Sequence, residues 1–252
     1  MKKQHFIILL IPLLAFCALA HSCSNKTNNV EPIRPLDNTQ FDGIDVSHHQ
    51  GVIDWETVSK DSRVKYVYIK ATEGSSHKDS KYNYNIKNAR KHGLKCGSYH
   101  YFTMHSKAQA QFNNFKATAK KNNQDLIPMV DVELNGKDKN GWIIDGCHTS
   151  KKMSKERERV ILTLKNLLAL FEKEYGCKPI IYCSYASYVQ VLSDDFKDYP
   201  IFLGNYAPKP RIDGYLIWQF TEKGSVNGIK GSVDLSRFHK GVELADIELI
   251  TP

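Results

Sequence analysis

The sequence lacks the residue patterns that usually hold a metal ion. Its 252 residues include six cysteines and ten histidines, yet no Cys-x-x-Cys occurs and no cluster of His and Cys has the spacing of a metal site. The adjacent pair His48-His49 comes nearest, but neighbouring side chains on a strand point to opposite faces and do not converge on one ion. We therefore expect neither a metal site nor a cofactor.

A long apolar run is also missing. The longest, Phe6 to Ala20, is too short to span a bilayer comfortably; it follows Lys2 and Lys3 and has the character of a signal-peptide core. We interpret residues 1–22 as a signal peptide, which predicts an exported protein.

The end of this run predicts a lipid anchor. Ala20-His21-Ser22-Cys23 resembles a loosely matched bacterial lipobox, with Cys23 as the lipidated first residue of the mature chain; Cys17 is the weaker candidate. The following residues are rich in Asn, Thr, Ser and Pro and have no apolar periodicity. Residues 23–40 are therefore predicted to be a flexible tether behind a lipidated cysteine.

Acidic residues are scarcer than basic ones. Removal of residues 1–22 leaves 33 basic and 27 acidic residues, a net charge of +6. A cationic surface favours nucleic acid, anionic lipid or an acidic cell-wall polymer as partner. The export signal argues against nucleic acid, and the basic residues are spread along the chain as on an ordinary solvated surface.

Four cysteines lie beyond Cys23, namely Cys96, Cys147, Cys177 and Cys183. An exported compartment permits disulfides. Four cysteines allow three pairings, and the sequence does not choose among them.

The most informative stretch is an apolar run, Leu126 to Glu133, that ends in Asp131 and Glu133. Alternate side chains of a strand share one face, so the two carboxyl groups lie together while Val132 points away. Like charges so close resist joint ionisation, and a shielded carboxyl stays protonated near neutral pH, as acid/base chemistry requires. An isolated Asp-x-Glu more often only marks a strand that enters a solvated loop, so the rest of the chain must decide.

Strand and helix patterns alternate along the chain. Five strand patterns are each followed by a helix pattern or a turn into one, and three more strand patterns follow with little helix between them. The strands are expected at residues 41–47, 65–71, 96–102, 126–133, 179–184, 201–206, 215–220 and 231–238. Three main helices are expected. One covers residues 82–92, the next follows Ser106, which is a possible N-cap, and the third runs from residue 160 until Gly176 stops it. This alternation favours an α/β fold with a mainly parallel sheet, and eight strands suggest a closed barrel.

In such a barrel the chemistry lies at the C-terminal ends of the strands. Asp45 ends the first strand, Asp131 and Glu133 end the fourth, and Asp234 lies in the last strand, which neighbours the first on closure. The sequence therefore predicts that four carboxylates meet at one mouth of the barrel.

Six ordered motifs resemble those of the family 25 glycoside hydrolases, the Chalaropsis-type lysozymes that cleave peptidoglycan. They are Ile44 to Gly51 with Ile53-Asp54-Trp55, Ile69 to Gly74, Tyr99 to Phe102, Met129 to Glu133, Trp218 to Phe220 and Val233 to Leu235. The resemblance covers about residues 41–240, leaving 241–252 as a C-terminal tail. It implies a single (β/α)5β3 barrel of the TIM type that acts as a monomeric N-acetylmuramidase. The bond cleaved would be the β-1,4 bond between N-acetylmuramic acid and N-acetylglucosamine of peptidoglycan.

Carried over by position, the resemblance makes Glu133 the general acid and Asp131 its strand partner, with Asp45 and Asp234 as the other catalytic acids. The implied substrate-binding residues are Trp218, as an apolar wall for a sugar, Tyr99, Tyr101, Glu73, Tyr182 and Tyr206. Other residues have simpler interpretations. Glu73 can pair with Lys70 instead of lining the site, whereas Asp42 and Asp54 suit turns or caps, and Trp55 suits the core.

The resemblance also implies a mechanism, hydrolysis with retention assisted by the acetamido group of the substrate. The main alternative is a non-catalytic protein that binds peptidoglycan in the same cleft; the presence of all four acids favours the hydrolase. Residues 203–206, Ser236 and an insertion at 134–149 depart from the family pattern and leave the sugar subsites open. The predicted location is the bacterial cell envelope, as a membrane-anchored lipoprotein on the periplasmic or cell-surface face.

Overall fold

The computed structural model describes residues 40–133, 151–206, 209–210 and 212–250. The predicted signal peptide, the lipidated Cys23, the tether and the 134–149 insertion lie outside these residues. Among the described helices, none is long and apolar enough to cross a membrane.

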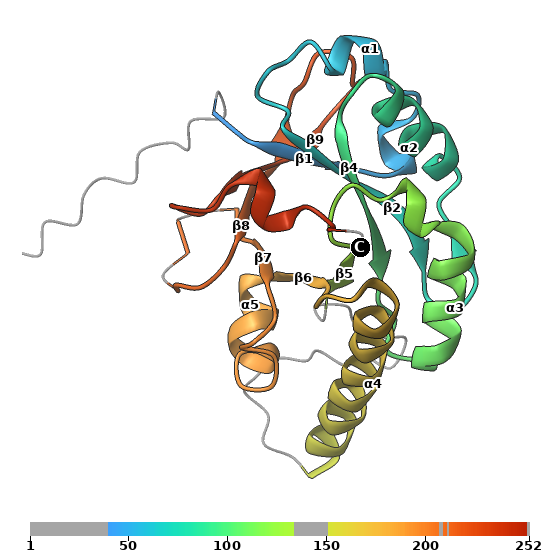
Figure 1. Ribbon diagram of the computed structural model, residues 1–252. Helices are drawn as coiled ribbons and strands as arrows, with labels where there is room; N and C mark the ends of the chain where they lie inside the picture. The colour runs from blue at the N-terminus through green and yellow to red at the C-terminus, as the bar shows by residue number, and fades with distance from the viewer. Residues whose placement is uncertain (1–39, 134–150, 207–208, 211, 251–252) are drawn as a thin grey trace, which may run out of the picture. The chain divides into compact units, whose positions relative to one another are not determined.

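Eight strands close into a barrel (Figure 1). The pairing of β1 with both β2 and β9 completes the ring. Of these eight strands, β9 is the one that runs antiparallel to both of its neighbours. Around the ring, the strands are β1 (Gly43–Val46), β2 (Tyr66–Glu73), β4 (Lys95–Tyr101), β5 (Met129–Val132), β6 (Ile180–Ser184), β7 (Ile201–Gly204), β8 (Ile217–Gly224) and β9 (Val233–Phe238). A two-residue strand, β3 (His77–Lys78), pairs with the end of β2.

Helices lie on the outside of the barrel, as Figure 1 shows for α2, α3 and α4. The helices are α1 (Trp55–Val58), α2 (Tyr82–Lys91), α3 (Ala108–Thr118), α4 (Lys151–Tyr175) and α5 (Tyr185–Ser187), the last continued by a π-helical turn, η3 (Tyr188–Leu192). Short 3-10 turns are η1 (His48–Gln50), η2 (Lys121–Asn123) and η4 (Leu244–Ile247). The predicted α/β barrel is confirmed. The exact (β/α)5β3 count stays a prediction, because α1 and α5 are single turns.

Several predicted boundaries shift for local reasons. Glycine ends α2 and α4 as expected, since Gly93 and Gly176 take φ values of +83° and +77° that other residues rarely adopt. Ser106 does not cap α3; the N-cap residue is Lys107, and its side chain makes no capping bond. The fourth predicted strand begins only at Met129, because Pro128 before it has no N–H to donate to a ladder.

The apolar residues form two layers. Along β2, Val67 and Ile69 join the outer cluster between barrel and helices, whereas Tyr66 and Tyr68 join an inner cluster that fills the barrel. The tyrosine rings need room beside the neighbouring strand: Gly43 on β1 pairs with Tyr66 on β2, and a Cβ at Gly43 would lie 2.2 Å from the Tyr66 ring. Glycine is therefore required where a tyrosine crosses the interior.

The segment predicted as a C-terminal tail packs against the base of the barrel. Ile247 is fully buried in the inner cluster, and its carbonyl accepts from the N–H of Ile127 at 2.8 Å. Leu126 forms a bridge with Glu248. Residues 244–249 thus close the end of the barrel at which β5 begins.

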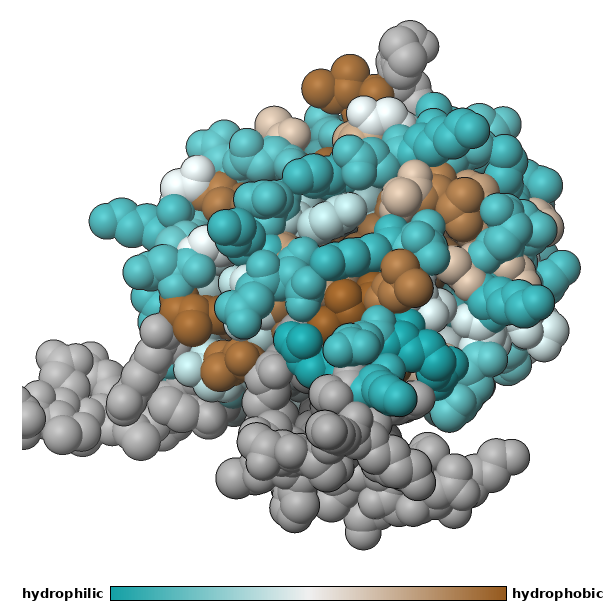
Figure 2. Space-filling model, turned by 90° about the horizontal axis from the view of Figure 1, so that it is seen from below, coloured by the Kyte–Doolittle hydropathy of each residue, from teal (hydrophilic) through white to brown (hydrophobic). Residues whose placement is uncertain are grey.

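The surface is mainly polar. Figure 2 shows one face on which hydrophilic residues surround a central strip of hydrophobic ones. The large hydrophobic residues that are exposed in the described segments are scattered over separate elements, namely Val52, Tyr84, Leu162, Val189, Tyr206 and Ile250. Most of the apolar side chains are therefore used in the two core layers.

The described cysteines are unpaired. Cys96 and Cys183 are buried, Cys177 is half-buried, and none of the three is linked to another. Any arrangement of two disulfides among the four cysteines needs one bond between two of Cys96, Cys177 and Cys183. Because these three are not linked to one another, none of the three arrangements is present. Cys147 lies outside the described residues.

Candidate active site

Four acidic side chains meet at the mouth of the barrel, the end at which its parallel strands finish. Asp131 follows Met129 of the inner cluster by two residues on β5, so it points inward, and Glu133 comes directly after that strand. Asp45 on β1 lies opposite Asp234 on β9. Because β9 runs antiparallel, its beginning lies at the end where β1 finishes, and the predicted convergence is confirmed.

Asp45 and Asp234 act as a pair. Asp45 is 8% exposed, and the pKa of its carboxyl is raised well above the ordinary value by burial and then by the charge of Asp234. Burial raises the pKa of the less buried Asp234 to about 6. A hydrogen bond between the two carboxyls raises the pKa of Asp45 and lowers that of Asp234. Both carboxyls therefore hold a proton more tightly than an isolated aspartate does, and the pair carries less than two full charges.

Asp131 and Glu133 form the second pair. Burial and the charge of Glu133 raise the pKa of Asp131 well above its ordinary value, and its buried Oδ1 has no hydrogen-bond partner in the described structure. The surrounding protein also raises the pKa of Glu133, although its side chain is exposed at the edge of the mouth. The hydroxyl of Tyr101 donates to Oε2 of Glu133 at 3.4 Å. A raised pKa beside a second acid suits a group that must deliver a proton near neutral pH.

Lys70 supplies positive charge beside this second pair. Its Nζ lies 2.8 Å from Oε2 of Glu73 and 4.8 Å from the centre of the Tyr101 ring, and its charge lowers the pKa of Asp131 and Glu133. The predicted pairing of Glu73 with Lys70 is therefore present. Since Lys70 acts on both acids, the ion pair is also part of the mouth.

The tyrosines of the mouth fall into two groups, those affected by the charges of the acids and those bonded to Gln219. The charges of Asp45, Asp131 and Asp234 all act on Tyr99, which raises the pKa of its hydroxyl in addition to the effect of burial. Tyr182 and Tyr206 instead donate to Oε1 of Gln219, at 2.8 and 3.0 Å.

Gln219 itself was not predicted. Its Nε2 donates to both carboxylate oxygens of Asp45, at 3.2 and 3.0 Å. A neutral amide has neither charge nor nucleophile to mark it in a sequence, and only its place within Trp218-Gln219-Phe220 pointed to the site.

The sequence profile described as "Glycosyl hydrolases family 25" matches residues 44–229. The chain belongs to this family. It is a glycoside hydrolase. The matched segment contains three of the four acids; the fourth, Asp234, is brought beside Asp45 by the pairing of β9 with β1.

The chain is similar to several proteins of known sequence or structure. The protein YegX of Escherichia coli K12, described as uncharacterized, is 35% identical over 208 residues, which cover 80% of this chain and 70% of YegX. The autolytic lysozyme of Clostridium acetobutylicum is 33% identical over 215 residues, or 83% of this chain and 59% of that lysozyme. The structure of a family 25 glycosyl hydrolase from Bacillus anthracis matches with a TM-score of 0.69 and 30% identity, over 82% of this chain and 93% of that one.

Trp218 lies away from the acids of this family 25 site. It is 6% exposed and belongs to the outer cluster, its Nε1 donates to the carbonyl of Asn205 at 2.7 Å, and its neighbour Gln219 takes the inward position. The predicted role of Trp218 as a wall for a sugar stays untested, and its burial argues against that role. Two other predictions are confirmed. Trp55 is a core residue, at 2% exposed, and Asp54 caps α1 by accepting from the N–H of Thr57.

His48 interacts with Asp79 and with its neighbour His49. Nδ1 of His48 lies 2.7 Å from the buried Asp79, and the two histidine rings lie 4.0 Å apart. No group of three or more potential metal ligands occurs among the described residues.

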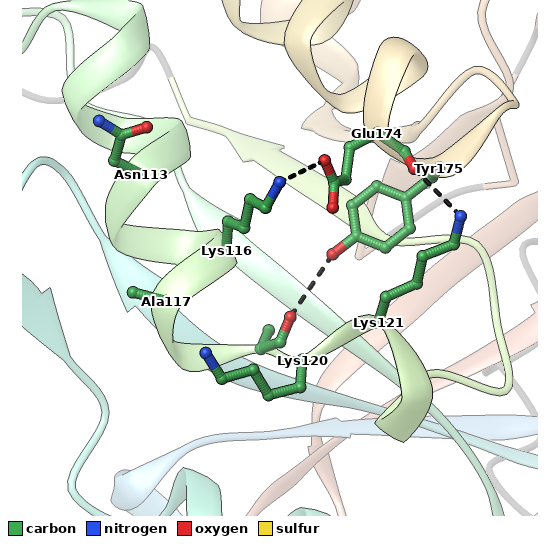
Figure 3. A pocket seen from close by; sticks show the side chains of 8 residues that line it. Asn113, Lys116, Ala117, Lys120, Lys121, Glu174 and Tyr175 are labelled. Atoms are coloured by element: carbon green, nitrogen blue, oxygen red, sulfur yellow. Dashed lines mark hydrogen bonds and ion pairs between the residues drawn. The ribbon is translucent and has the colours of Figure 1, made fainter.

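A hollow of about 380 Å³ lies at the opposite end of the family 25 barrel, between α3 and the end of α4 (Figure 3). Nζ of Lys116 lies 2.6 Å from Oε2 of Glu174, and Nζ of Lys121 donates to the Glu174 carbonyl at 3.1 Å. Tyr175 donates to the carbonyl of Ala119. These contacts hold α3 against α4 and involve none of the four acids at the mouth.

Proposed function

We propose that this glycoside hydrolase is a lysozyme that cleaves the β-1,4 bond between N-acetylmuramic acid and N-acetylglucosamine in peptidoglycan. The observation that carries the proposal is the pair of Asp131 and Glu133 at the mouth, in which burial raises both pKa values and the charge of Glu133 raises that of Asp131 further. The autolytic lysozyme of Clostridium acetobutylicum and lysozyme M1 of Streptomyces globisporus, 33% and 27% identical to the chain, support the substrate class.

Glu133 begins the reaction as the general acid. Its raised pKa keeps a proton available, and its position at the edge of the mouth leaves the carboxyl accessible to the oxygen between the two sugars. Transfer of this proton to the glycosidic oxygen lets N-acetylglucosamine depart as an alcohol while the anomeric carbon gains positive charge.

Asp131 serves the opposite face of the reacting sugar. Residues two apart on one strand have Cα atoms about 7 Å apart. This spacing does not clearly match either the short carboxyl separation of an ordinary retaining enzyme or the longer one of an inverting enzyme. The acetamido oxygen of the muramic residue supplies the nucleophile instead and forms a bond to the anomeric carbon. The unpartnered Oδ1 of Asp131 can orient the acetamido N–H and stabilise its developing positive charge.

Glu133 then completes the cycle as a base. Its carboxylate takes a proton from water, the hydroxide attacks the anomeric carbon, and the bond to the acetamido oxygen breaks. Two displacements at one carbon give net retention, and Glu133 regains its proton. Asp45 and Asp234 hold the sugar and tune the two central acids.

The composition of the products tests the function. Intact peptidoglycan digested with the protein should yield fragments that end in reducing N-acetylmuramic acid, as measured by mass spectrometry after reduction. Fragments that end in reducing N-acetylglucosamine would mean that the other glycosidic bond is cut. Binding to the wall with no fragments released would favour the non-catalytic alternative.

The stereochemistry tests the mechanism separately. NMR of early products should show the β-anomer of the muramic residue first, and wall whose muramic residues are de-N-acetylated should resist cleavage because the internal nucleophile is missing. Initial release of the α-anomer, or equal cleavage of both walls, would rule out substrate assistance while leaving the lysozyme activity intact.

We further propose that the protein is exported and held on the membrane of a bacterial cell envelope through lipidated Cys23. The support is the sequence of residues 1–23 and the extracellular wall as substrate.

A further inference from the structure

Gln219 joins four separate parts of the barrel mouth. Its Oε1 accepts hydrogen bonds from Tyr182 on β6 and from Tyr206 beyond β7, and its Nε2 donates to Asp45 on β1. Gln219 lies on β8 and is only 2% exposed, so water competes little for these bonds. Asp45 and Gln219 are 174 positions apart in the chain.

Asp45 determines which way the amide points. The oxygen and nitrogen of a glutamine side chain are assigned from their partners. A tyrosine hydroxyl can donate or accept, whereas the carboxyl oxygens of Asp45 that face Gln219 accept. Tyr182 and Tyr206 present hydroxyl donors to Oε1, and Asp45 presents acceptor oxygens to Nε2. The reversed amide would place its oxygen against the carboxyl oxygens of Asp45, which leaves donors and acceptors mismatched.

We propose that Gln219 is a positioning residue for the catalytic acids, which holds the carboxyl of Asp45 in place beside Asp234 and stabilises the negative charge that the two acids share. The inference rests on the proposed function for its catalytic consequence. Asp45 is buried and Asp234 is only partly buried, so Gln219 supplies a donor to the member of the pair that water reaches least.

The electrostatic effect agrees with this geometry. The bond from Gln219 lowers the pKa of Asp45, whereas burial and the charge of Asp234 raise it. The other titratable groups whose charges act on Asp45 or Asp234, or on which these two act, are Asp131, Glu133, Glu222, Tyr66, Tyr99, Tyr182 and Tyr206. Of the groups around Asp45, Gln219 is the one whose bond lowers its pKa, so its loss should move the titration of the pair upward.

Two substitutions separate this role from a merely structural one. Gln219→Leu removes the amide and leaves a buried apolar side chain of similar size. We expect kcat/KM on peptidoglycan to fall about ten- to a hundredfold, the range for loss of a hydrogen bond to a charged group, and the acidic limb of the pH profile to move to higher pH. Gln219→Glu keeps the shape and donates only while its new carboxyl is protonated. Its activity should be closest to that of the wild type at acidic pH and should fall as the pH rises.

Gln124→Leu is the matched control. Gln124 is also buried, at 6% exposed, and its Oε1 accepts from the N–H of Ser98 at 2.9 Å, but it lies near the start of β5, at the other end of the barrel. We expect this variant to lower the thermal unfolding midpoint without moving the pH profile. If Gln219→Leu behaves in the same way, Gln219 is only a structural brace and the proposal fails.

A second measurement does not depend on activity. Carbon NMR of the aspartate carboxyl groups follows the titration of Asp45 and Asp234 directly. Their midpoints should rise in Gln219→Leu and stay in place in Gln124→Leu; unchanged midpoints in both would overturn the proposal. A wild-type protein that fails to cut peptidoglycan would contradict the proposed function, and the titration would still decide the role of Gln219.

Discussion

At the scale of single residues, the acids of the mouth are kept in an environment that disfavours their charge. Burial is the largest cause of the raised pKa at Asp45, Asp131, Glu133 and Asp234. An ionised carboxylate without full hydrogen bonding inside a protein reduces stability. The acid cluster therefore serves the chemistry at the expense of the stability of the fold.

Glu133 is the residue on which activity depends most directly. Glu133→Gln keeps the shape of the side chain but removes the acidic proton, so turnover of peptidoglycan should fall by a factor on the order of a hundred to ten thousand. Glu56→Gln, an exposed change in an ion pair with Lys60, should leave turnover unchanged. Near-wild-type turnover of Glu133→Gln would assign the acid role to another residue.

Asp131 should show the opposition between stability and function. Its folded-state pKa is raised above the ordinary value of 3.8, so the folded protein binds this proton more tightly than the unfolded chain does. The charge at Asp131 thus lowers the free energy of unfolding progressively as the pH rises above 3.8. Asp131→Asn should be more stable than the wild type at neutral pH, by a margin that shrinks on acidification, while activity is lost. Urea unfolding at several pH values measures this margin; a margin that grows on acidification would contradict the assigned shift.

At the scale of secondary-structure elements, a buried polar chain joins β2, β4 and α3. Nδ1 of His100 lies 2.8 Å from the hydroxyl of Thr72, and its Nε2 lies 3.1 Å from Oε1 of Gln111. Gln111 also bonds to the backbone of Thr103 and Ser106. The chain fixes the segment between β4 and α3, directly beyond the strand that carries Tyr99 and Tyr101.

Protonation of His100 should loosen this region. Burial lowers its pKa from 6.5 to about 4, so the unfolded chain binds the proton first as the pH falls. The stability contributed by neutral His100 is complete above pH 6.5 and should decline by about 1.4 kcal/mol per pH unit down to about pH 4. His100→Gln should be less stable at pH 7 but should lose less on acidification, measured by urea unfolding. The exposed His77→Gln serves as control, and equal slopes in all three proteins would contradict the prediction.

At the scale of the whole molecule, the two ends of the barrel have different tasks. The acids gather where the parallel strands finish, whereas residues 244–249 close the end where they begin. This division leaves the mouth as the place where a long polysaccharide can bind.

The predicted lipid anchor belongs to this scale as well. Cys23 is expected to carry two acyl chains, because one chain alone gives only marginal membrane binding. Wild-type protein expressed with its own signal peptide should pellet with membranes, and Cys23→Ala should appear in the soluble fraction. Cys17→Ala is the matched control. Equal membrane binding of the wild type and Cys23→Ala would rule out the anchor at this position.

The limits of sequence reasoning show at particular residues. Trp218 and Gln219 are adjacent, and strand geometry requires that they face opposite sides, yet the pattern did not say which one faces inward. The family resemblance pointed to Trp218 as a site residue, whereas the structure turns Gln219 toward the acids and places Trp218 in the outer cluster. The choice depends on the register of β8 against its neighbours, which local sequence does not contain.

By itself the sequence determined the alternation of strands and helices, the order of the family motifs and the four acids, because these follow from local periodicity and from side-chain chemistry. Only the tertiary structure decided what surrounds each acid: the proton shared by Asp45 and Asp234, the amide of Gln219 and the lysine beside Asp131. The physical reason is that a pKa and a hydrogen bond depend on burial and on neighbours within a few ångströms, and barrel closure brings those neighbours together from distant parts of the chain.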